Sequence, residues 1–91
     1  MRIDELVWDE ENERHIARHG VSPEEVEEVC FGRHYVRRSR KGRYLILGQT
    51  EAGRYLRVVL ERLQGYKFRP ITASDMSRWE RRLYHREKRG R

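Results

Sequence analysis

The sequence predicts an α+β domain in which an antiparallel sheet of about five strands packs against two N-terminal helices and one C-terminal helix. Helix-start signals followed by helically spaced apolar residues occur near both ends of the chain, in residues 9–31 and 77–89. Between them, short runs rich in valine, isoleucine, leucine and tyrosine alternate with turn segments, as in a meander of strands. A chain of 91 residues has room for one such domain with a single modest core.

The first strand and the first helix are expected within the first 20 residues. Residues 5–8 (Glu-Leu-Val-Trp) form a short run that favours a strand. Asp9 can then cap a helix of roughly residues 10–19, because an aspartate side chain accepts hydrogen bonds from the free amides of the first turn. Gly20 can end this helix in the left-handed conformation that follows many helices.

The second helix has the clearest start signal in the chain. Ser22 is a favoured N-cap, Pro23 suits the first helical position, and the two glutamates that follow suit the positive end of the helix dipole. Gly32 is expected to end this helix. Its apolar side consists of Val26, Val29 and Cys30.

Four strands are expected after the second helix, separated by turns at residues 39–42, 50–53 and 64–65. Pro70 lies in the last of them and lacks an amide hydrogen, so part of that strand should be an edge or lie next to a bulge. The expected strands cover residues 34–38, 44–48, 54–62 and 66–73.

The last helix should begin at Ser77. Ser77 and Glu80 have the spacing of a capping box, in which each side chain accepts a hydrogen bond from the other residue's backbone amide. Both tryptophans, Trp8 and Trp79, are expected to lie in the core. The expected apolar face of the helix consists of Met76, Trp79 and Leu83. A cationic stripe on the same helix consists of Arg78, Arg82, His85 and Arg89, with Arg81 beside it.

Charge is distributed unevenly along the chain. Residues 1–30 carry ten acidic residues and three arginines, a net charge of −7. Residues 31–91 carry eighteen lysines and arginines and five acidic residues, a net charge of +13. This asymmetry favours a surface that binds a polyanion on the C-terminal two-thirds of the chain. The alternative is a charged surface that serves only to keep the protein in solution.

Several classes of protein are disfavoured. No apolar stretch approaches the length of a membrane helix, and the first residues lack the apolar segment of a signal peptide. A single cysteine, Cys30, cannot form an internal disulfide, which fits a reducing compartment. The chain also lacks a glycine-rich phosphate loop and a nucleophile elbow. We therefore expect a cytoplasmic protein that does not engage a membrane.

A metal site is not expected either. His15 and His19 have the spacing of a zinc-binding pair on a helix, but no third ligand is suitably placed. Cys30 falls on an apolar helix face, and His34 and His85 are isolated in the sequence. Packed or capping histidines and a core cysteine are therefore the expected roles, without a metal or cofactor.

The predicted strands bring basic side chains together on the sheet. Alternation places Tyr55, Arg57, Val59 and Glu61 on one face of their strand, and Lys67, Arg69, Ile71 and Ala73 on one face of the next. Such a sheet can hold an RNA backbone, and it can stabilise the charge that builds on phosphorus when a 2′-hydroxyl attacks, without a metal. Binding without chemistry is the alternative. The tyrosines that lie among basic residues, either as core residues or as platforms for base stacking, are Tyr44, Tyr55 and Tyr66.

Three blocks of the sequence form a recognisable pattern when they are taken in order. The first block consists of Trp8-Asp9 and His19-Gly20-Val21-Ser22. The second consists of Tyr44, Leu45, Gly48, Thr50, Gly53-Arg54, Val58-Val59 and Arg62. The third consists of Arg69, Ile71-Thr72-Ala73, Asp75-Met76, Glu80-Arg81-Arg82 and Tyr84. In these three blocks the chain resembles the BrnT family of toxins, and the resemblance covers residues 7–86.

The resemblance implies a RelE-like fold and an endoribonuclease that blocks translation by acting on mRNA, either free or on the ribosome. It also implies a cognate BrnA-type antitoxin, through which alone the protein would engage operator DNA. By position in these blocks, Arg54 and Arg69 are candidates for phosphate or transition-state contacts. Glu80 is a candidate for proton transfer, with its capping-box role as the alternative. The further residues expected to contact RNA are Arg57, Lys67, Arg78, Arg82, His85 and Arg89.

One position departs from the family pattern. Members usually have arginine after Ile-Thr-Ala, whereas this chain has Ser74. If that arginine stabilises the transition state, its loss costs about 3–4 kcal/mol, unless another cation, Lys67, Arg57 or Arg78, compensates.

Two functions therefore stay open. One is a metal-independent endoribonuclease toxin of a type II toxin–antitoxin system. The other is a non-catalytic protein of the same fold that binds RNA or the antitoxin. In either case residues 1–91 are expected to form one BrnT-like domain, and the sequence leaves open whether the basic end, residues 86–91, is ordered.

Overall fold

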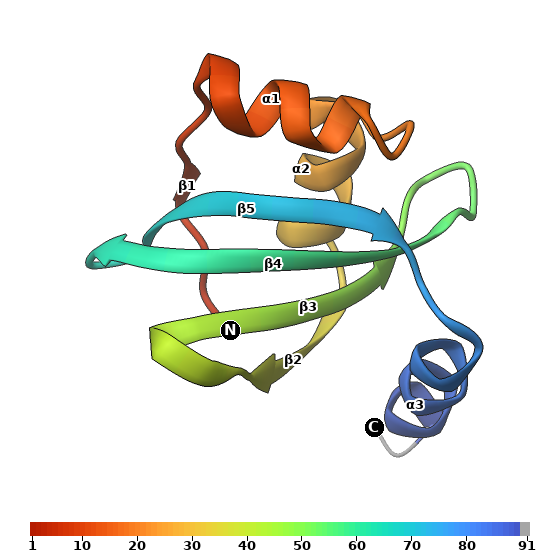
Figure 1. Cartoon of the computed structure of the whole chain (residues 1–91). Helices are drawn as coiled ribbons and strands as arrows, with labels where there is room; N and C mark the ends of the chain where they lie inside the picture. Colours follow the sequence, from red (N-terminus) through yellow and green to blue (C-terminus); the bar gives the residue numbers. More distant parts are fainter. Residues whose placement is uncertain (90–91) are drawn as a thin grey trace.

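The computed structural model describes residues 1–89 of the chain. In this part of the chain, five strands, three α-helices and one short 3₁₀ helix follow one another (Figure 1). Their bounds are β1 Glu5–Leu6, α1 Glu10–Ala17, α2 Pro23–Phe31, β2 His34–Arg38, η1 Arg40–Gly42, β3 Arg43–Gln49, β4 Tyr55–Gln64, β5 Lys67–Asp75 and α3 Arg78–Arg89.

All of these strands join one sheet with the spatial order β1-β5-β4-β3-β2. Neighbouring strands are antiparallel except β1, which runs parallel to β5. Helices α1 and α2 lie on one side of the sheet, and α3 lies on the other side near one end (Figure 1). The α+β fold class predicted from the sequence is confirmed.

The main core lies between the sheet and the two N-terminal helices. Ile16 of α1 and Val29 of α2 are fully buried and belong to one cluster with Phe68 of β5. Burial of an aliphatic or aromatic side chain of this size stabilises the fold by about 1.5–3 kcal/mol. Cys30 belongs to the same cluster, and burial raises the pKa of its thiol to about 12. Cys30 is thus a core residue, as predicted.

Both N-terminal helices begin at the predicted caps. The amide of Asn12 donates to the Asp9 carboxylate at 2.8 Å, and the amide of Asp9 donates to the Asn12 side chain at 2.9 Å. Ser22 and Glu25 form the equivalent capping box at the start of α2, with bonds of 3.2 and 3.1 Å. Helix α1 ends at Ala17, two residues earlier than expected.

Pro70 marks a bulge in β5. Strand β4 pairs with Pro70 and then with Thr72, which leaves Ile71 as an extra residue. Beyond this point the alternation is shifted, and Ala73 lies in the main core together with Phe68. The predicted common face of Lys67, Arg69, Ile71 and Ala73 is therefore wrong for Ala73, because a strict period of two does not hold across a bulge.

Helix α3 begins with the predicted capping box, and Met76 and Leu83 of its predicted apolar face are buried, whereas Trp79 is not. The amide of Glu80 donates to Ser77 Oγ at 3.1 Å, and the amide of Ser77 donates to Glu80 Oε1 at 2.8 Å. The buried side of the helix consists of Met76, Glu80, Leu83 and Tyr84. Trp79 is 52% exposed, so its predicted core position is wrong: Glu80 takes the buried position, and Trp79 lies on the flank. Trp8 does pack against the main core.

Helix α3 continues to Arg89, so residues 86–89 of the basic end are helical, and residues 90–91 lie outside the described part of the chain. Within residues 1–89, no helix is long and apolar enough to cross a membrane.

Candidate functional site

The face of the sheet opposite α1 and α2, called here the open face, is covered by α3 at one end only. Along β4, fully buried residues that face the helices alternate with half-buried residues that face the other way. Cross-strand pairing arranges the half-buried residues in rows. One row is Leu47, Arg57 and Ser74, and the next is Arg37, Leu45, Val59 and Thr72. Arg57 lies on β4, the central strand of the sheet. Its row neighbour Leu47 is buried by α3, so Arg57 lies next to the start of that helix.

Glu80 at the start of α3 holds the Arg57 side chain. Arg57 Nε donates to Glu80 Oε2 at 2.7 Å, and the two side chains are 31% and 9% exposed. The other oxygen of Glu80 accepts the Ser77 amide in the capping box, so the carboxylate is fixed from two directions. In the described part of the chain no other carboxylate contacts Arg57. Its terminal N–H groups are therefore left for a ligand, and a guanidinium suits a phosphate well.

Aromatic and cationic side chains of α3 extend this surface. The Arg81 guanidinium lies 4.1 Å from the centre of the Tyr55 ring, and the ring of His85 lies 5.3 Å from the same ring. The guanidinium of Arg37 lies 5.5 Å from the centre of the exposed Trp79 ring. Cations interleaved with exposed rings are the combination that binds single-stranded nucleic acid.

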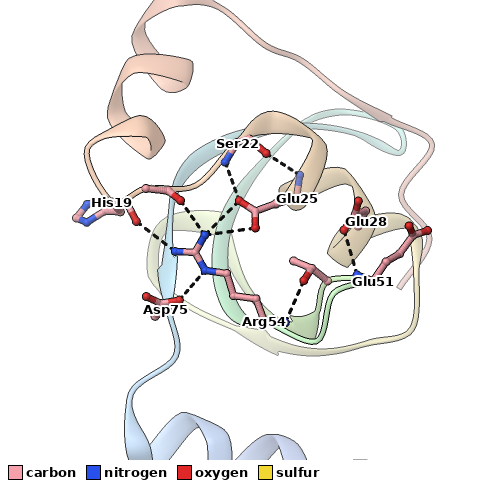
Figure 2. Close-up of polar contacts among 9 residues, drawn as sticks. His19, Ser22, Glu25, Glu28, Glu51, Arg54 and Asp75 are labelled. Carbon is pink, nitrogen blue, oxygen red and sulfur yellow. Dashed lines mark hydrogen bonds and ion pairs between the residues drawn. The ribbon is translucent and has the colours of Figure 1, made fainter.

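Arg54 lies elsewhere, at the centre of a polar network that joins the loop after α1 to the ends of β4 and β5 (Figure 2). Its Nε donates to Asp75 at 2.8 Å, and one terminal nitrogen donates to the Gly20 carbonyl at 2.7 Å and to Glu25 at 3.2 Å. The other terminal nitrogen donates to the His19 carbonyl at 3.4 Å. The bond with Asp75 raises the pKa of Arg54 and lowers the pKa of Asp75. Protein acceptors thus occupy most of this guanidinium.

Arg69 is also engaged by carboxylates. It contacts Asp9 through Nε at 2.9 Å and Glu11 through a terminal nitrogen at 3.0 Å, which joins β5 to the start of α1. The hydrogen bond from Arg69 is the main reason that the pKa of Asp9 is lowered. The three predicted catalytic residues, Arg54, Arg69 and Glu80, therefore lie in three separate places, and of these Glu80 is the one that contacts Arg57.

The predicted RNA contacts are spread out as well. Arg57 and His85 lie in the open-face group described above. Lys67 begins β5, and its Nζ lies 3.9 Å from a carboxylate of β1. The remaining ones lie on α3 and are Arg78, Arg82 and Arg89.

Two residues of this surface, Arg37 and Trp79, were not predicted from the sequence to belong to it. Arg37 was detectable, because alternation along β2 places it on the same face as Tyr35. The exposure of Trp79 was not, because its helix spacing suits a core position equally well. For metals, residues 1–89 contain no group of three His, Cys, Asp or Glu side chains that could hold an ion.

Comparison with known proteins agrees with this fold. The chain is similar in structure to the crystal structure of the Brucella abortus ribonuclease toxin BrnT, with a TM-score of 0.67 and 18% sequence identity, over 81% of this chain and 97% of that one. Among curated protein sequences, none matches the chain. A model of the family described as "Ribonuclease toxin, BrnT, of type II toxin-antitoxin system" matches residues 8–80. The chain therefore belongs to the BrnT family of ribonuclease toxins of type II toxin–antitoxin systems.

Proposed function

We propose that this toxin is an endoribonuclease that cleaves RNA at the open face of its sheet without a metal ion, and that this cleavage inhibits translation. The observation that carries the proposal is the pairing of Arg57 with Ser74 across β4 and β5. Ser74 occupies the position where the BrnT pattern usually has arginine. Side chains that are direct cross-strand neighbours have Cβ atoms about 4.5–5.5 Å apart. A guanidinium from position 57 therefore reaches the region that an arginine at position 74 would serve.

The other two candidates for compensation are less well placed. Lys67 lies at the opposite end of β5, where it neighbours a carboxylate of β1. Arg78 is exposed in the first turn of α3. Arg57 alone of the three combines the correct row of the sheet with a carboxylate that fixes its side chain.

In the proposed reaction the 2′-oxygen forms a bond to the adjacent phosphorus and the bond to the 5′-oxygen breaks. Arg57 stabilises the negative charge that accumulates on the phosphate oxygens, as fixed donors do in oxyanion sites. Glu80 acts as a positioning residue, because both of its oxygens are already used, by Ser77 and by Arg57. His85 is the proposed group that takes the 2′-hydroxyl proton, because an imidazole nitrogen can accept a proton and this ring lies 5.3 Å from that of Tyr55, which shares a face of β4 with Arg57. The leaving 5′-oxygen takes a proton from solvent water, and His85 returns its proton to solvent after the cleavage.

This proposal makes a direct prediction about products and metals. Purified toxin, with or without ribosomes, should cut RNA in the presence of EDTA and leave 2′,3′-cyclic or 3′-phosphate ends, because the attacking group is the neighbouring 2′-hydroxyl. End-group analysis of the fragments is the measurement. A strict need for a divalent ion, or 3′-hydroxyl ends, would contradict the mechanism. RNA that is bound but never cut would instead favour the non-catalytic function, which the Ser74 departure keeps open.

Neutralisation by a BrnA-type antitoxin is part of the same proposal. The region after residue 30 carries a net charge of +13, so an acidic segment laid across the open face and α3 would find many cationic partners. Expression of the toxin without its partner should arrest growth, and co-expression of the antitoxin should relieve the arrest.

Trp79 should act as a stacking platform for an RNA base. Replacing it by alanine should weaken RNA binding about tenfold, because one base–aromatic stack is worth about 1–3 kcal/mol. Trp79→Phe should keep most of the affinity. Titration with a 2′-O-methyl RNA, which lacks the attacking hydroxyl, measures binding without cleavage. The matched control is Trp8→Phe, on the other side of the sheet, and equal affinities of Trp79→Ala and Trp79→Phe would rule out stacking.

A further inference from the structure

A second cationic surface lies at the end of the sheet remote from α3. Four contacts link arginine and tyrosine side chains in series: Arg38 to Tyr44 at 5.9 Å, Arg62 to Tyr44 at 5.8 Å, Arg62 to Tyr66 at 5.9 Å and Arg2 to Tyr66 at 4.3 Å, each measured from guanidinium carbon to ring centre. We call these five residues the arginine–tyrosine row. Its members come from the N-terminus, from β2, β3 and β4, and from the β4–β5 turn.

Part of this row serves the fold. Arg62 also lies 5.3 Å from the ring of Phe68, which is fully buried, and Tyr44 packs edge-on against the same ring. The stem of Arg62 therefore covers one end of the main core. This role explains an apolar contact at position 62. It does not explain why three cations lie in one row, where their like charges repel each other.

The charge of the row is poorly compensated within the protein. Arg2 pairs with Asp4 at 2.9 Å, but Arg38 and Arg62 contact no carboxylate in the part of the chain that the structure describes. Both are exposed. The exposed Arg40 and Lys41 of η1 follow Arg38 after one intervening residue, Ser39. Stacking occupies the flat faces of a guanidinium and leaves its in-plane N–H donors available, which suits a phosphate group.

The row lies on the other side of the sheet from Arg57. Arg38 pairs with Tyr44 on the helix-covered side, at the end of the sheet away from α3, so a short ligand cannot contact the row and the open-face site at once. Tyr66 is 43% exposed at the turn and offers a ring to an unpaired base. An exposed ring beside the guanidinium of Arg62, which has no carboxylate partner among residues 1–89, fits single-stranded RNA better than an acidic peptide, which needs cations alone.

We propose that the arginine–tyrosine row is a second RNA-binding surface, which holds single-stranded RNA outside the catalytic site through its phosphates. The inference rests on the proposed function only in taking RNA as the ligand. It does not require that the toxin cleaves RNA.

The test compares two double variants that each remove two positive charges. Arg38→Gln/Arg62→Gln changes the row, and the matched control Arg14→Gln/Arg18→Gln changes exposed arginines at the end of α1 that have no carboxylate partner among residues 1–89. A 2′-O-methyl RNA is titrated at several salt concentrations. The row variant should bind at least tenfold more weakly, and the negative slope of log affinity against log salt should become shallower by about 1.4, which corresponds to the loss of two phosphate contacts on a single strand. The control should change neither by a comparable amount.

Two further comparisons separate a binding role from a structural one. Arg38→Lys/Arg62→Lys keeps the charges and should restore most of the affinity and slope, whereas loss in both the Gln and the Lys variants together with a lower Tm would mean that the row only supports the fold. Changing the row in an Arg57→Ala background should weaken RNA binding by the same factor as in the wild-type background, because the free-energy effects of separate sites add independently.

Equal RNA binding by the row variant and its control would overturn the proposal. So would weakened antitoxin binding with unchanged RNA binding, which would make the row a protein-binding surface. A toxin that cuts no RNA can still pass this test, so failure of the proposed catalysis is recognised separately by the cleavage assay.

Discussion

Replacing Arg57 by alanine should lower the turnover number for RNA cleavage by about 10²–10³-fold, the usual effect of removing one donor from an oxyanion site. The effect should be mainly on turnover rather than on binding, because several other cations remain to hold the substrate. Glu80 loses its partner in this variant but keeps the Ser77 amide, so α3 should still form. Single-turnover cleavage of a defined RNA, with Arg86→Ala as an exposed control on α3, measures the loss.

A second substitution makes this prediction specific to the geometry. Ser74→Arg restores the residue that the family pattern has, directly across from position 57. In the Arg57→Ala background it should recover about tenfold or more of the lost rate, because the new guanidinium approaches the same phosphate. Arg57→Lys should recover less, since an ammonium lacks the planar fork. If Ser74→Arg recovers nothing while the double variant stays folded, the two positions do not serve one site.

The local parts of this arrangement follow from the sequence, and the long-range parts do not. The Ser77 and Glu80 capping box and the common face of Tyr55 and Arg57 rest on spacings within one element, and both appear in the structure. The ion pair between Arg57 and Glu80 joins residues 23 positions apart, and no local pattern specifies it. The capping box already suggested that Glu80 would be fixed in place, but not that its second oxygen would hold an arginine of the sheet.

The wrong predictions for Trp79 and Ala73 both depend on contacts between parts of the chain that are distant in sequence. Two sets of residues in this segment have acceptable spacing for a helix face: 76, 79 and 83, or 76, 80, 83 and 84. Residue type favours the first set, because tryptophan is buried more often than glutamate. The structure buries Glu80 because Arg57 and the Ser77 amide satisfy its carboxylate, which removes the usual cost. In β5 an edge or a bulge was expected at Pro70, but the effect of the bulge on the alternation at Ala73 depends on the pairing register.

Removing the Arg54 side chain should destabilise the fold rather than act on cleavage alone. Arg54→Ala deprives two carboxylates, Glu25 and Asp75, and two carbonyl groups of their shared donor. Hydrogen bonds to charged groups contribute about 1.5–3 kcal/mol, and partial exposure of this network reduces that figure, so a loss of about 2 kcal/mol is expected. For a domain of this size the corresponding decrease in Tm is about 10 °C. Thermal unfolding followed by circular dichroism measures it, with the exposed Arg18→Ala as control.

The pH dependence of that loss identifies the network as its cause. The pKa of Asp75 is lowered in the folded state by Arg54, so this carboxylate contributes stability above its unfolded pKa of about 3.9. That contribution disappears as pH falls through the lower folded pKa. The stability difference between wild type and Arg54→Ala should therefore be fully present near neutral pH and shrink below about pH 4. The resemblance to BrnT toxins offers the competing interpretation, in which Arg54 contacts the substrate. A variant that unfolds like the wild type at neutral pH but no longer cuts RNA would support that interpretation and refute the structural one.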